Sequence, residues 1–445
     1  MKKLQRTLAP LIISLMLSPA SQAEDLLQIY QAALQSDPVL SAQESAFDAT
    51  SESQRQTKAL YYPNIALSAS TARNRQNTIS SSLGPQFTGR SDFNTKGYSL
   101  SLRQAIYSWD YVSQLRQAEA SVRQAEAELN QAYQDIILRV AQRYFDVLAA
   151  RDGLEFSQAE KNAISRQLDQ AKQRFEVGLI AITDVHEAQA AYDLATASEI
   201  VAQNNLATSR QALRELTGEL PQKLATLGPQ MGLASPDPTN IEEWADSALQ
   251  GNFSLLAAES ATEVAQQGLS QQRAGRHPTL DLVASRNYNF TGGGSFGSRE
   301  TEDSQVSLQL NLPLYQGGGV SAGIRRANAQ LAQAKDALEQ QRRATQREAS
   351  DAYLSVLAGI SQVKALRQAV TSSESALNAT EAGYDVGTRT AVDVLNARRE
   401  LFRTQRDYAR ARYDYILASL RLQQAAGMLD INDIEQINAW LISAS

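Results

Sequence analysis

Two long stretches of this chain contain no proline. None of its 11 prolines lies between Pro85 and Pro221 or after Pro313. Because proline removes a helix hydrogen bond and clashes with the preceding turn, only proline-free stretches can form very long helices. This feature limits the possible folds, because a helix of that length exceeds the width of a compact domain.

Apolar residues recur at steps of three and four through the first of these stretches. The pattern predicts one nearly continuous helix from Asp110 to Val177, which would extend roughly 100 Å at about 1.5 Å per residue. Ala, Gln and Glu dominate its other face, which favours helices packed side by side. The spacing is that of a coiled-coil seam, formed by Leu115, Ala118, Val122, Ala125, Leu129, Ala132, Ile136, Val140, Tyr144 and Val147.

One turn occurs twice in the sequence. RFEVGLIAITDV spans residues 174–185 and GYDVGTRTAVDV spans residues 383–394, an offset of 209. An internal two-fold repeat, produced by tandem duplication, is therefore predicted. At the same offset, further matches are Ala118/Ala327, Ala125/Ala334, Leu129/Leu338, Tyr144/Tyr353, Val147/Val356, Leu148/Leu357, Ala149/Ala358, Ala188/Ala397, Gly218/Gly427 and Leu220/Leu429. Upstream, an offset of 215 aligns Ala33, Leu34, Ala46 and Pro63 with Ala248, Leu249, Ala261 and Pro278.

The repeat boundaries divide the mature chain into two repeats, a linker and a tail. In each repeat a helix and a strand pair precede a long helical hairpin. Residues 221–240 contain four prolines and form the linker. The predicted bounds are 24–220 for the first repeat (strand pair about 63–108, hairpin about 110–217), 241–429 for the second (strand pair about 279–315, hairpin about 319–427) and 430–445 for the tail.

Between the helical arms the apolar period changes from 3.6 to 2, which predicts strands. The loops that join each pair are rich in Gly and Ser, and aromatic residues gather at the opposite strand ends, as in the interfacial girdle of a membrane barrel. A soluble sandwich with buried aromatic residues is the alternative. The four alternating series are Ile65, Leu67 and Ala69; Tyr98, Leu100 and Leu102; Leu280, Leu282 and Ala284; and Val306, Leu308, Leu310 and Leu312, and the aromatic residues are Tyr61, Tyr62, Tyr107, Trp109, Tyr111 and Tyr315.

Residues 1–23 have the pattern of a signal peptide. Three basic residues precede an apolar stretch from Leu8 to Leu17 that is too short to cross a bilayer, and Ser21 and Ala23 suit the cleavage site. Their removal changes the formal charge from −6 to −9, so a nucleic-acid partner has no electrostatic support. The chain has no cysteine, which excludes disulfides, thiolate metal sites and a lipid anchor on cysteine. Because of the signal peptide, we expect an exported protein. After residue 23 the sequence has no run of 18 apolar residues, so we expect no membrane-spanning helix.

Four strands in one chain leave two open sheet edges. Lipid does not tolerate open edges, because their backbone groups find no water to bond. Two copies would give an eight-stranded barrel filled by side chains, whereas three copies give twelve strands and room for an aqueous lumen. The expected fold is mainly α with a small β part. It is a homotrimer whose 12-stranded transmembrane β-barrel continues into a long α-helical coiled-coil barrel.

The chain resembles the TolC-type outer-membrane channel-tunnels of Gram-negative bacteria. The resemblance covers the whole mature chain, and its most specific segments are RQLDQAKQRFEVGLIAITDV (166–185), AGYDVGTRTAVDVLNA (382–397) and LPLYQGG (312–318). It implies a trimeric duct in the outer membrane that extends through the periplasm. We expect the tail to pack around the waist of the tunnel. The implied function is export of small molecules (multidrug efflux), of proteins (type I secretion), or of both.

The two repeated turns would lie at the hairpin tips, far from the membrane. The resemblance places Asp393 in a ring of carboxylates at the periplasmic constriction, where three like charges attract cations. The family usually has a second aspartate where this chain has Asn396, which implies a weaker cation site. Asp184 with Glu187, and Thr390 with Asp393, also have capping-box spacing, so helix capping alone would explain both aspartates.

The resemblance also implies a closure network of polar bonds at the tips. Asp184, with Thr183 beside it, would bond Tyr384 of its own protomer and Arg389 of the neighbouring protomer. Gln167 would bond Glu381.

The expected partners are a periplasmic adaptor (membrane fusion) protein, an inner-membrane pump or ABC transporter, and outer-membrane lipid. The chain must rely on such a pump, because it has no nucleotide-binding loop of the G-x-x-x-x-G-K-[ST] type. The adaptor would dock at the tips, on Val177, Gly178, Leu179, Val386, Gly387 and Thr388.

Two other classes of function compete with a duct. An enzyme is poorly supported, because the only histidines are His186 and His277 and the chain has no nucleophile elbow or metal-ligand spacing. No cofactor or metal is expected. The second alternative is a structural coiled-coil or adhesin stalk in the periplasm, without a channel. The choice between drug efflux and protein secretion stays open.

Overall fold

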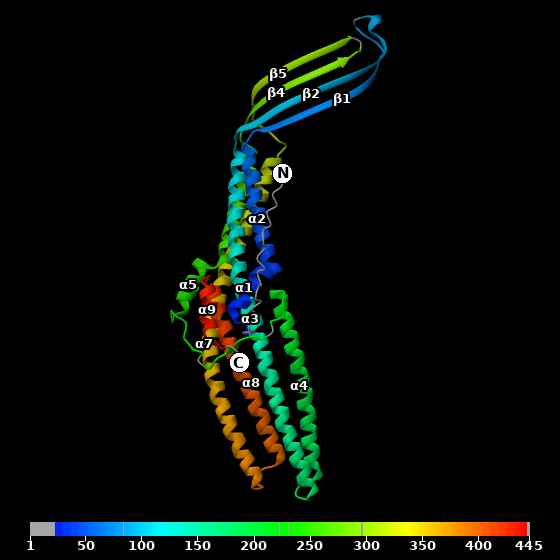
Figure 1. Cartoon of the computed structure of the whole chain (residues 1–445). Coiled ribbons are helices and arrows are strands. Elements are labelled where there is room, and N and C mark those ends of the chain that lie inside the picture. The colour runs from blue at the N-terminus through cyan, green and yellow to red at the C-terminus, as the bar shows by residue number, and fades with distance from the viewer. Residues whose placement is uncertain (1–22, 83, 222, 230, 295–296, 443–445) are drawn as a thin grey trace, which may run out of the picture.

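A computed structural model describes residues 23–82, 84–221, 223–229, 231–294 and 297–442. The molecule is elongated, with a sheet at one end and two helical hairpins at the other (Figure 1). Residues 1–22 of the predicted signal peptide lie outside the described residues. So do Leu83, Gln222, Gln230, Ser295, Phe296 and residues 443–445 of the predicted loops, linker and tail.

The same order of elements occurs twice along the chain. The fold is mostly helical with a small sheet, which confirms that part of the sequence prediction. The first set is α1 (Leu26–Ser36), α2 (Pro38–Lys58), β1 (Asn64–Thr78), β2 (Gly89–Ser108), α3 (Trp109–Glu176) and α4 (Ile182–Thr217). The second set is α5 (Ile241–Gly251), α6 (Phe253–Ala274), β4 (Thr279–Gly292), β5 (Ser298–Asn311), α7 (Gly319–Asp385) and α8 (Ala391–Ala425). The shorter elements are η1 (Ala59–Tyr61), η2 (Pro85–Phe87), β3 (Thr226–Leu227), α9 (Ile431–Asn438) and β6 (Leu441–Ile442).

Helices α3 and α7 run from the sheet to the hairpin tips. They contain 68 and 67 residues, and each extends roughly 100 Å at about 1.5 Å per residue. Helix α3 begins at Trp109, where Ser108 caps it by accepting a hydrogen bond from the backbone N–H of Tyr111. The helix expected from 110 to 177 therefore differs from the observed one by a single residue at each end. Among the described helices, none is both long and apolar enough to cross a membrane.

The main sheet is antiparallel, with the strand order β1-β2-β4-β5. Strands β1 and β2 pair along their full length, from Asn64 opposite Arg103 to Thr78 opposite Gly89. Strands β4 and β5 pair in the same way. The β1–β2 and β4–β5 hairpins join through pairing of β2 with β4, and the register of that pairing shifts between Ala105 and Tyr107. Strands β1 and β5 therefore form the two free edges.

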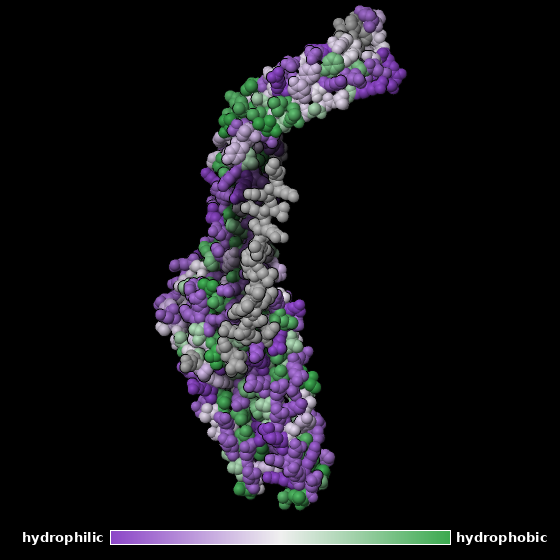
Figure 2. All heavy atoms as spheres, in the orientation of Figure 1, coloured by the Kyte–Doolittle hydropathy of each residue, from purple (hydrophilic) through white to green (hydrophobic). Residues whose placement is uncertain are grey.

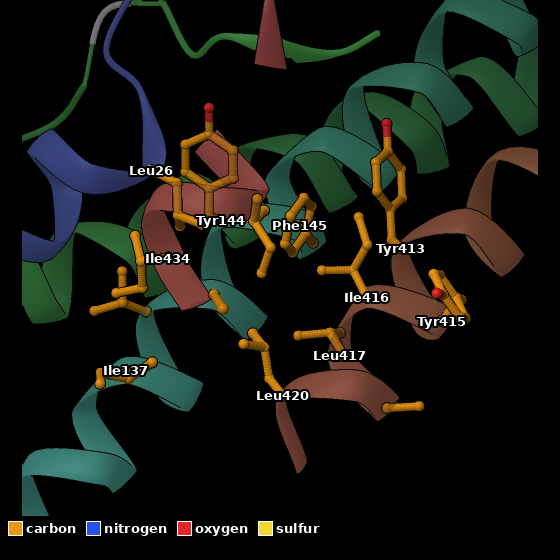
Figure 3. Close-up of a cluster of buried hydrophobic side chains, with 14 of the residues drawn as sticks. Leu26, Ile137, Tyr144, Phe145, Tyr413, Tyr415, Ile416, Leu417, Leu420 and Ile434 are labelled. Carbon is orange, nitrogen blue, oxygen red and sulfur yellow. The ribbon is translucent and has the colours of Figure 1, made fainter. Parts of the chain in front are cut away.

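The main hydrophobic core lies midway along the helices, where α1 and α9 meet α3 and α8 (Figure 3). Phe145 stacks on Tyr413, with ring centroids 5.4 Å apart, and meets Tyr144 edge-on at 5.6 Å. The hydroxyl of Tyr144 donates a 2.8 Å hydrogen bond to the carbonyl of Ala225, and burial raises the pKa of this phenol. Ile434 of the predicted tail is fully buried in this cluster.

The predicted linker packs against the same part of the molecule. Tyr415 accepts a hydrogen bond from the backbone N–H of Ala234 and donates one to its carbonyl, both 3.0 Å long. Strand β3 of the linker pairs with β6 of the tail. These bonds satisfy backbone groups that an irregular segment cannot pair by itself.

Candidate functional site

The first repeated turn ends helix α3 at the tip of the first hairpin. Gly178 has a φ of +76°, which glycine adopts without steric cost. Its N–H donates to the carbonyl of Phe175 (2.9 Å), and the N–H of Leu179 donates to the carbonyl of Arg174 (2.8 Å). These two bonds form a Schellman motif, which satisfies the last carbonyls of a helix.

The second repeated turn ends helix α7 in the same way. Gly387 has a φ of +79° and donates to the carbonyl of Tyr384 (3.1 Å). The N–H of Thr388 donates to the carbonyl of Gly383 (2.8 Å). The repeated Val-Gly pair is therefore a helix terminator that the chain uses once per hairpin.

Apolar side chains project from both tips. Val177, Leu179 and Val386 are 71%, 73% and 76% exposed, and Figure 2 shows hydrophobic colour at the ends of both hairpins. These residues belong to the six predicted for adaptor docking. Gly178, Gly387 and Thr388 are also exposed.

The return helices begin differently in the two hairpins. Helix α4 begins at Ile182, and Ala181 caps it without a side-chain hydrogen bond. Asp184 thus lies inside the first turn, next to the exposed Thr183, where a carboxylate suits the positive end of the helix dipole. The capping box expected for Asp184 with Glu187 is wrong, because the helix has already begun at Ile182.

Helix α8 begins with the capping box expected for Thr390 and Asp393. The carboxylate of Asp393 accepts hydrogen bonds from the N–H and the hydroxyl of Thr390, both 2.9 Å, and the N–H of Asp393 donates to Thr390 Oγ1 (3.2 Å). The backbone bond, followed by the side-chain bond, lowers the pKa of Asp393 below that of an ordinary aspartate. Asn396 lies three residues later and is exposed.

A guanidinium joins the two hairpins just above the tips. Arg398 of α8 donates to the carbonyl of Ala163 (3.1 Å) and to Oε1 of Gln167 (3.4 Å) on α3, and it forms an ion pair with Glu381 of α7. The amide of Gln167 donates to the carbonyl of Ala391 (3.4 Å). The expected direct bond from Gln167 to Glu381 is therefore replaced by a bridge through Arg398, whose planar fork serves both acceptors.

Tyr384 also has a different partner from the one expected. The guanidinium of Arg174 lies 4.9 Å from the centre of the Tyr384 ring and 3.7 Å from the carboxylate of Asp385. This cation–π contact ties the end of α3 to the end of α7. In the part of the chain that the structure describes, no hydrogen bond joins Asp184 to Tyr384. The expected pair is wrong within this protomer, because the ring faces α3. Arg389 is exposed, and its expected contact with Asp184 of a second protomer stays a prediction.

Together these side chains line a polar cleft of about 340 Å³ between the two hairpins. Its lining includes three arginines and two carboxylates, which come from α3, α7 and α8. Neither here nor elsewhere in the described ranges does a cluster of three His, Asp or Glu side chains occur that could hold a metal ion. The cleft lies at a junction of α3, α7 and α8, which the hydrogen bonds and ion pairs of Arg398 and Arg174 bridge.

The sheet at the opposite end of the molecule has one apolar face. The register sets Ile65 opposite Leu102, Leu102 opposite Ala284, and Ala284 opposite Val306. Figure 2 shows hydrophobic colour over the part of the sheet next to the helices. Nearer the loops the same face becomes charged. The apolar residues are Ile65, Leu67, Ala69, Tyr98, Leu100, Leu102, Leu280, Leu282, Ala284, Val306, Leu308 and Leu310, and the other face carries Ser68, Ser70, Ser99, Ser101, Asn287, Asn289, Ser307 and Gln309.

Comparison with known proteins assigns the fold to a family. A model of the outer membrane efflux protein family matches residues 29–219 and again residues 244–428. The chain belongs to this family. Outer membrane efflux proteins are transport channels, and the chain is accordingly an outer membrane protein.

Individual relatives align with this outer membrane efflux protein over nearly its whole length. The outer membrane protein TolC of Vibrio cholerae is 39% identical over 442 residues, which are 98% of this chain and 99% of that protein. The alkaline protease secretion protein AprF of Pseudomonas aeruginosa is 27% identical, over 96% of this chain and 90% of that protein. The crystal structure of the outer membrane protein VceC of Vibrio cholerae has the same fold, with a TM-score of 0.77 and 22% identity over 90% of this chain and 96% of that one.

Arg174, the partner of Tyr384, was not singled out by the sequence of this outer membrane efflux protein, and neither was Arg398. Its partner Gln167 lies 231 positions away and its partner Glu381 lies 17 positions away. Helical spacing within one hairpin cannot reveal a contact between two hairpins. The nearest signal was indirect, since Gln167 and Glu381 were both expected in one network.

Proposed function

We propose that three copies of this chain form an exit duct through the outer membrane. The four-stranded sheet carries the proposal, since one face is apolar, the other is polar, and both edges are free. Three such sheets give a 12-stranded barrel that turns its apolar faces to lipid and its polar faces to a water-filled lumen. The roughly 100 Å helices then continue the duct through the periplasm as an α-helical barrel.

The two halves of the chain are copies of one ancestral unit in this proposal. The recurring order of elements and the two Schellman turns support it, as do the two separate segments that match the family. Three copies then present six similar hairpin tips around one axis. A ring of six tips suits a periplasmic adaptor protein with its own repeated hairpins, and the exposed Val177, Leu179 and Val386 supply apolar contact area.

The tips also hold the duct closed at rest. Arg398 and Arg174 tie the two hairpins of each protomer together. Between protomers, Arg389 bonds Asp184. Partly buried arginine pairs of this kind are strong enough to hold a conformation, yet they exchange readily for other partners. Engagement of the adaptor, and of the inner-membrane pump behind it, breaks these bonds and opens the lumen.

The cargo comprises small molecules, secreted proteins, or both. Deletion of the gene distinguishes them. If the duct serves efflux, the deletion strain is inhibited by apolar toxic compounds at several-fold lower concentration. If it serves secretion, a normally exported protein accumulates inside the cells. A structural stalk predicts neither change, so a deletion strain with both phenotypes unaltered would refute the proposal. The wild-type gene on a plasmid is the control and should restore both.

Asp393 is expected to make the duct prefer cations, since three copies around the axis concentrate negative charge at the constriction. Asp393→Asn should reduce the preference, and Asn396→Asp should increase it. The reversal potential in a KCl gradient across a planar bilayer measures this preference. An unchanged reversal potential in Asp393→Asn would place Asp393 outside the conduction path.

The preference should also depend on pH in a defined direction. Hydrogen bonds from Thr390 lower the pKa of Asp393, so the carboxylate stays charged as pH falls through the usual aspartate range near about 4. Cation preference is thus retained through that range and lost only below the lowered pKa. Thr390→Val removes the side-chain bond and should move the loss to higher pH. Identical pH profiles for this variant and the wild type would contradict this role of Thr390.

A further inference from the structure

The two free edges of the sheet carry opposite charge. On the apolar face, β1 places Arg73 and Arg75 beyond its apolar residues, and β5 places Glu300 and Glu302 beyond its own. In the described part of its own chain, Arg73 forms no ion pair. The following inference rests on the proposed trimer, in which β1 of one copy meets β5 of the next.

The pattern of faces limits how these edges can pair. Apolar residues occupy odd positions on β1, such as Ile65 and Leu67, and even positions on β5, such as Val306 and Leu308. Side chains alternate between the faces of a sheet, so residues directly opposite each other lie on the same face. A continuous apolar surface therefore requires odd residues of β1 opposite even residues of β5. Registers that differ by one residue are excluded.

Barrel geometry selects among the registers that remain. Within one copy, a line across the strands joins Ile65 to Val306. Four strands span about 19 Å around the barrel, and a tilt of about 35–45° displaces the next copy by about 13–19 Å along the strands, or about four to six residues. A shift of four requires a tilt of about 35°, whereas a shift of six requires about 47°. In the opposite direction Val306 would face residue 61, which precedes β1.

With a shift of four residues, apolar side chains of β1 lie opposite apolar side chains of β5, and arginines lie opposite glutamates. Ile65 lies opposite Leu310, Leu67 opposite Leu308 and Ala69 opposite Val306. Further along, Arg73 lies opposite Glu302 and Arg75 opposite Glu300. Opposite charges across a strand pair stabilise a sheet, and like charges destabilise it.

We propose that the seam between protomers has this register and is held by Arg73–Glu302 and Arg75–Glu300 ion pairs. Existing pairs within each copy extend the network. Arg75 already contacts Asp92 at 3.0 Å, and Glu302 contacts Arg286 at 3.3 Å. The seam thus extends each pair into a row of three alternating charges on the outer face, beyond the apolar band: Asp92–Arg75–Glu300 and Arg73–Glu302–Arg286. A second copy of this chain is the partner that fits the edge.

Engineered disulfides test the register directly. The natural chain has no cysteine, so Ala69→Cys/Val306→Cys introduces the only thiols. Within one copy these positions are three strand spacings apart, about 14 Å, and are also displaced by four residues, about 13 Å, along the strands, so they lie far beyond the roughly 7 Å limit for a disulfide. Mild oxidation of the full-length protein should therefore give covalent dimers and trimers on denaturing gels, which a reductant converts to monomers. Thr71→Cys/Val306→Cys, shifted by two residues, is the matched control and should crosslink far less.

Charge reversal tests the ion pairs. Arg73→Glu and Glu302→Arg should each lower the temperature at which the trimer dissociates in SDS, and the double variant should recover part of the loss. Lys96→Glu reverses a charge on the same face of β2, away from the edges, and should show no coupling to Glu302→Arg.

The outcomes separate this inference from the proposed function. Two results would overturn the seam. One is stronger crosslinking in Thr71→Cys/Val306→Cys than in Ala69→Cys/Val306→Cys. The other is an Arg73→Glu/Glu302→Arg variant whose trimer dissociates at no higher temperature than the single variants. A wild-type protein that is monomeric in detergent overturns the trimer itself. Strong crosslinking at Ala69→Cys/Val306→Cys together with recovery in the double variant supports both.

Discussion

Replacing Arg398 with glutamine should raise the conductance of the purified duct several-fold. The side chain of Arg398 is only 19% exposed, and it holds Glu381 of α7 and two acceptors on α3. Glutamine is too short to reach all three acceptors and carries no charge. The two hairpins of each protomer then lose their main polar tie, and the closed tip loses stability relative to the open one.

The size of this effect follows from the burial of the pair. Hydrogen bonds to charged groups contribute about 1.5–3 kcal/mol, and exposed ion pairs about 0–1 kcal/mol. Glu381 is 38% exposed, so we expect about 1–2 kcal/mol per protomer. If three protomers open together, the closed state loses about 3–6 kcal/mol of stability relative to the open state, enough to shift the closed-to-open ratio by more than about a hundredfold. The rise in conductance is then limited by the width of the bore.

Single-channel recording in a planar bilayer measures the effect of Arg398→Gln. Arg403→Gln is a matched control, because Arg403 lies on the same helix and, among the residues that the structure describes, forms an ion pair with Glu400 of its own turn alone, at 2.9 Å. Arg398→Lys keeps the charge but loses the planar fork and should give an intermediate conductance. Equal conductance in Arg398→Gln and Arg403→Gln would show that Arg398 does not hold the tip closed.

Replacing Phe145 with alanine should destabilise the middle of each protomer by about 3–5 kcal/mol. Phe145 is 1% exposed and lies between Tyr144 and Tyr413 (Figure 3). Its removal leaves a cavity where α1 and α9 pack against α3 and α8. The aromatic contacts with both tyrosines are lost as well.

Thermal unfolding followed by circular dichroism at 222 nm measures this loss. Phe175→Ala is the control, because Phe175 lies near a tip and is 41% exposed. The midpoint of unfolding should fall clearly for Phe145→Ala and little for Phe175→Ala. Equal changes in the two variants would contradict the assignment of the core to the middle of the helices.

Local signals account for the parts of the fold that the sequence predicted well. The bounds of α3 follow from a proline-free stretch, a capping serine at 108 and a glycine at 178. The strands follow from alternation of apolar and polar residues. Asp393 was expected in a capping box, because both partners lie within one turn of the chain.

Contacts between distant segments could not be predicted in the same way. The pairing of β2 with β4 brings Thr95 opposite Thr291, and nothing local specifies that register. The start of α4 was misjudged at Asp184, since Ala181 caps the helix without a side-chain bond. Arg398 was missed because its partners lie on two other helices, and their meeting depends on how the hairpins pack.

The number of chains in one conducting particle tests the central claim most directly. Full-length protein purified in detergent can be weighed by native mass spectrometry, and the same fraction can be inserted into a planar bilayer. Three open-edged sheets should close into one barrel, so we predict particles of three chains that pass ions in discrete steps. A stable monomer, or a trimer that passes no ions even with Arg398→Gln, would contradict the account.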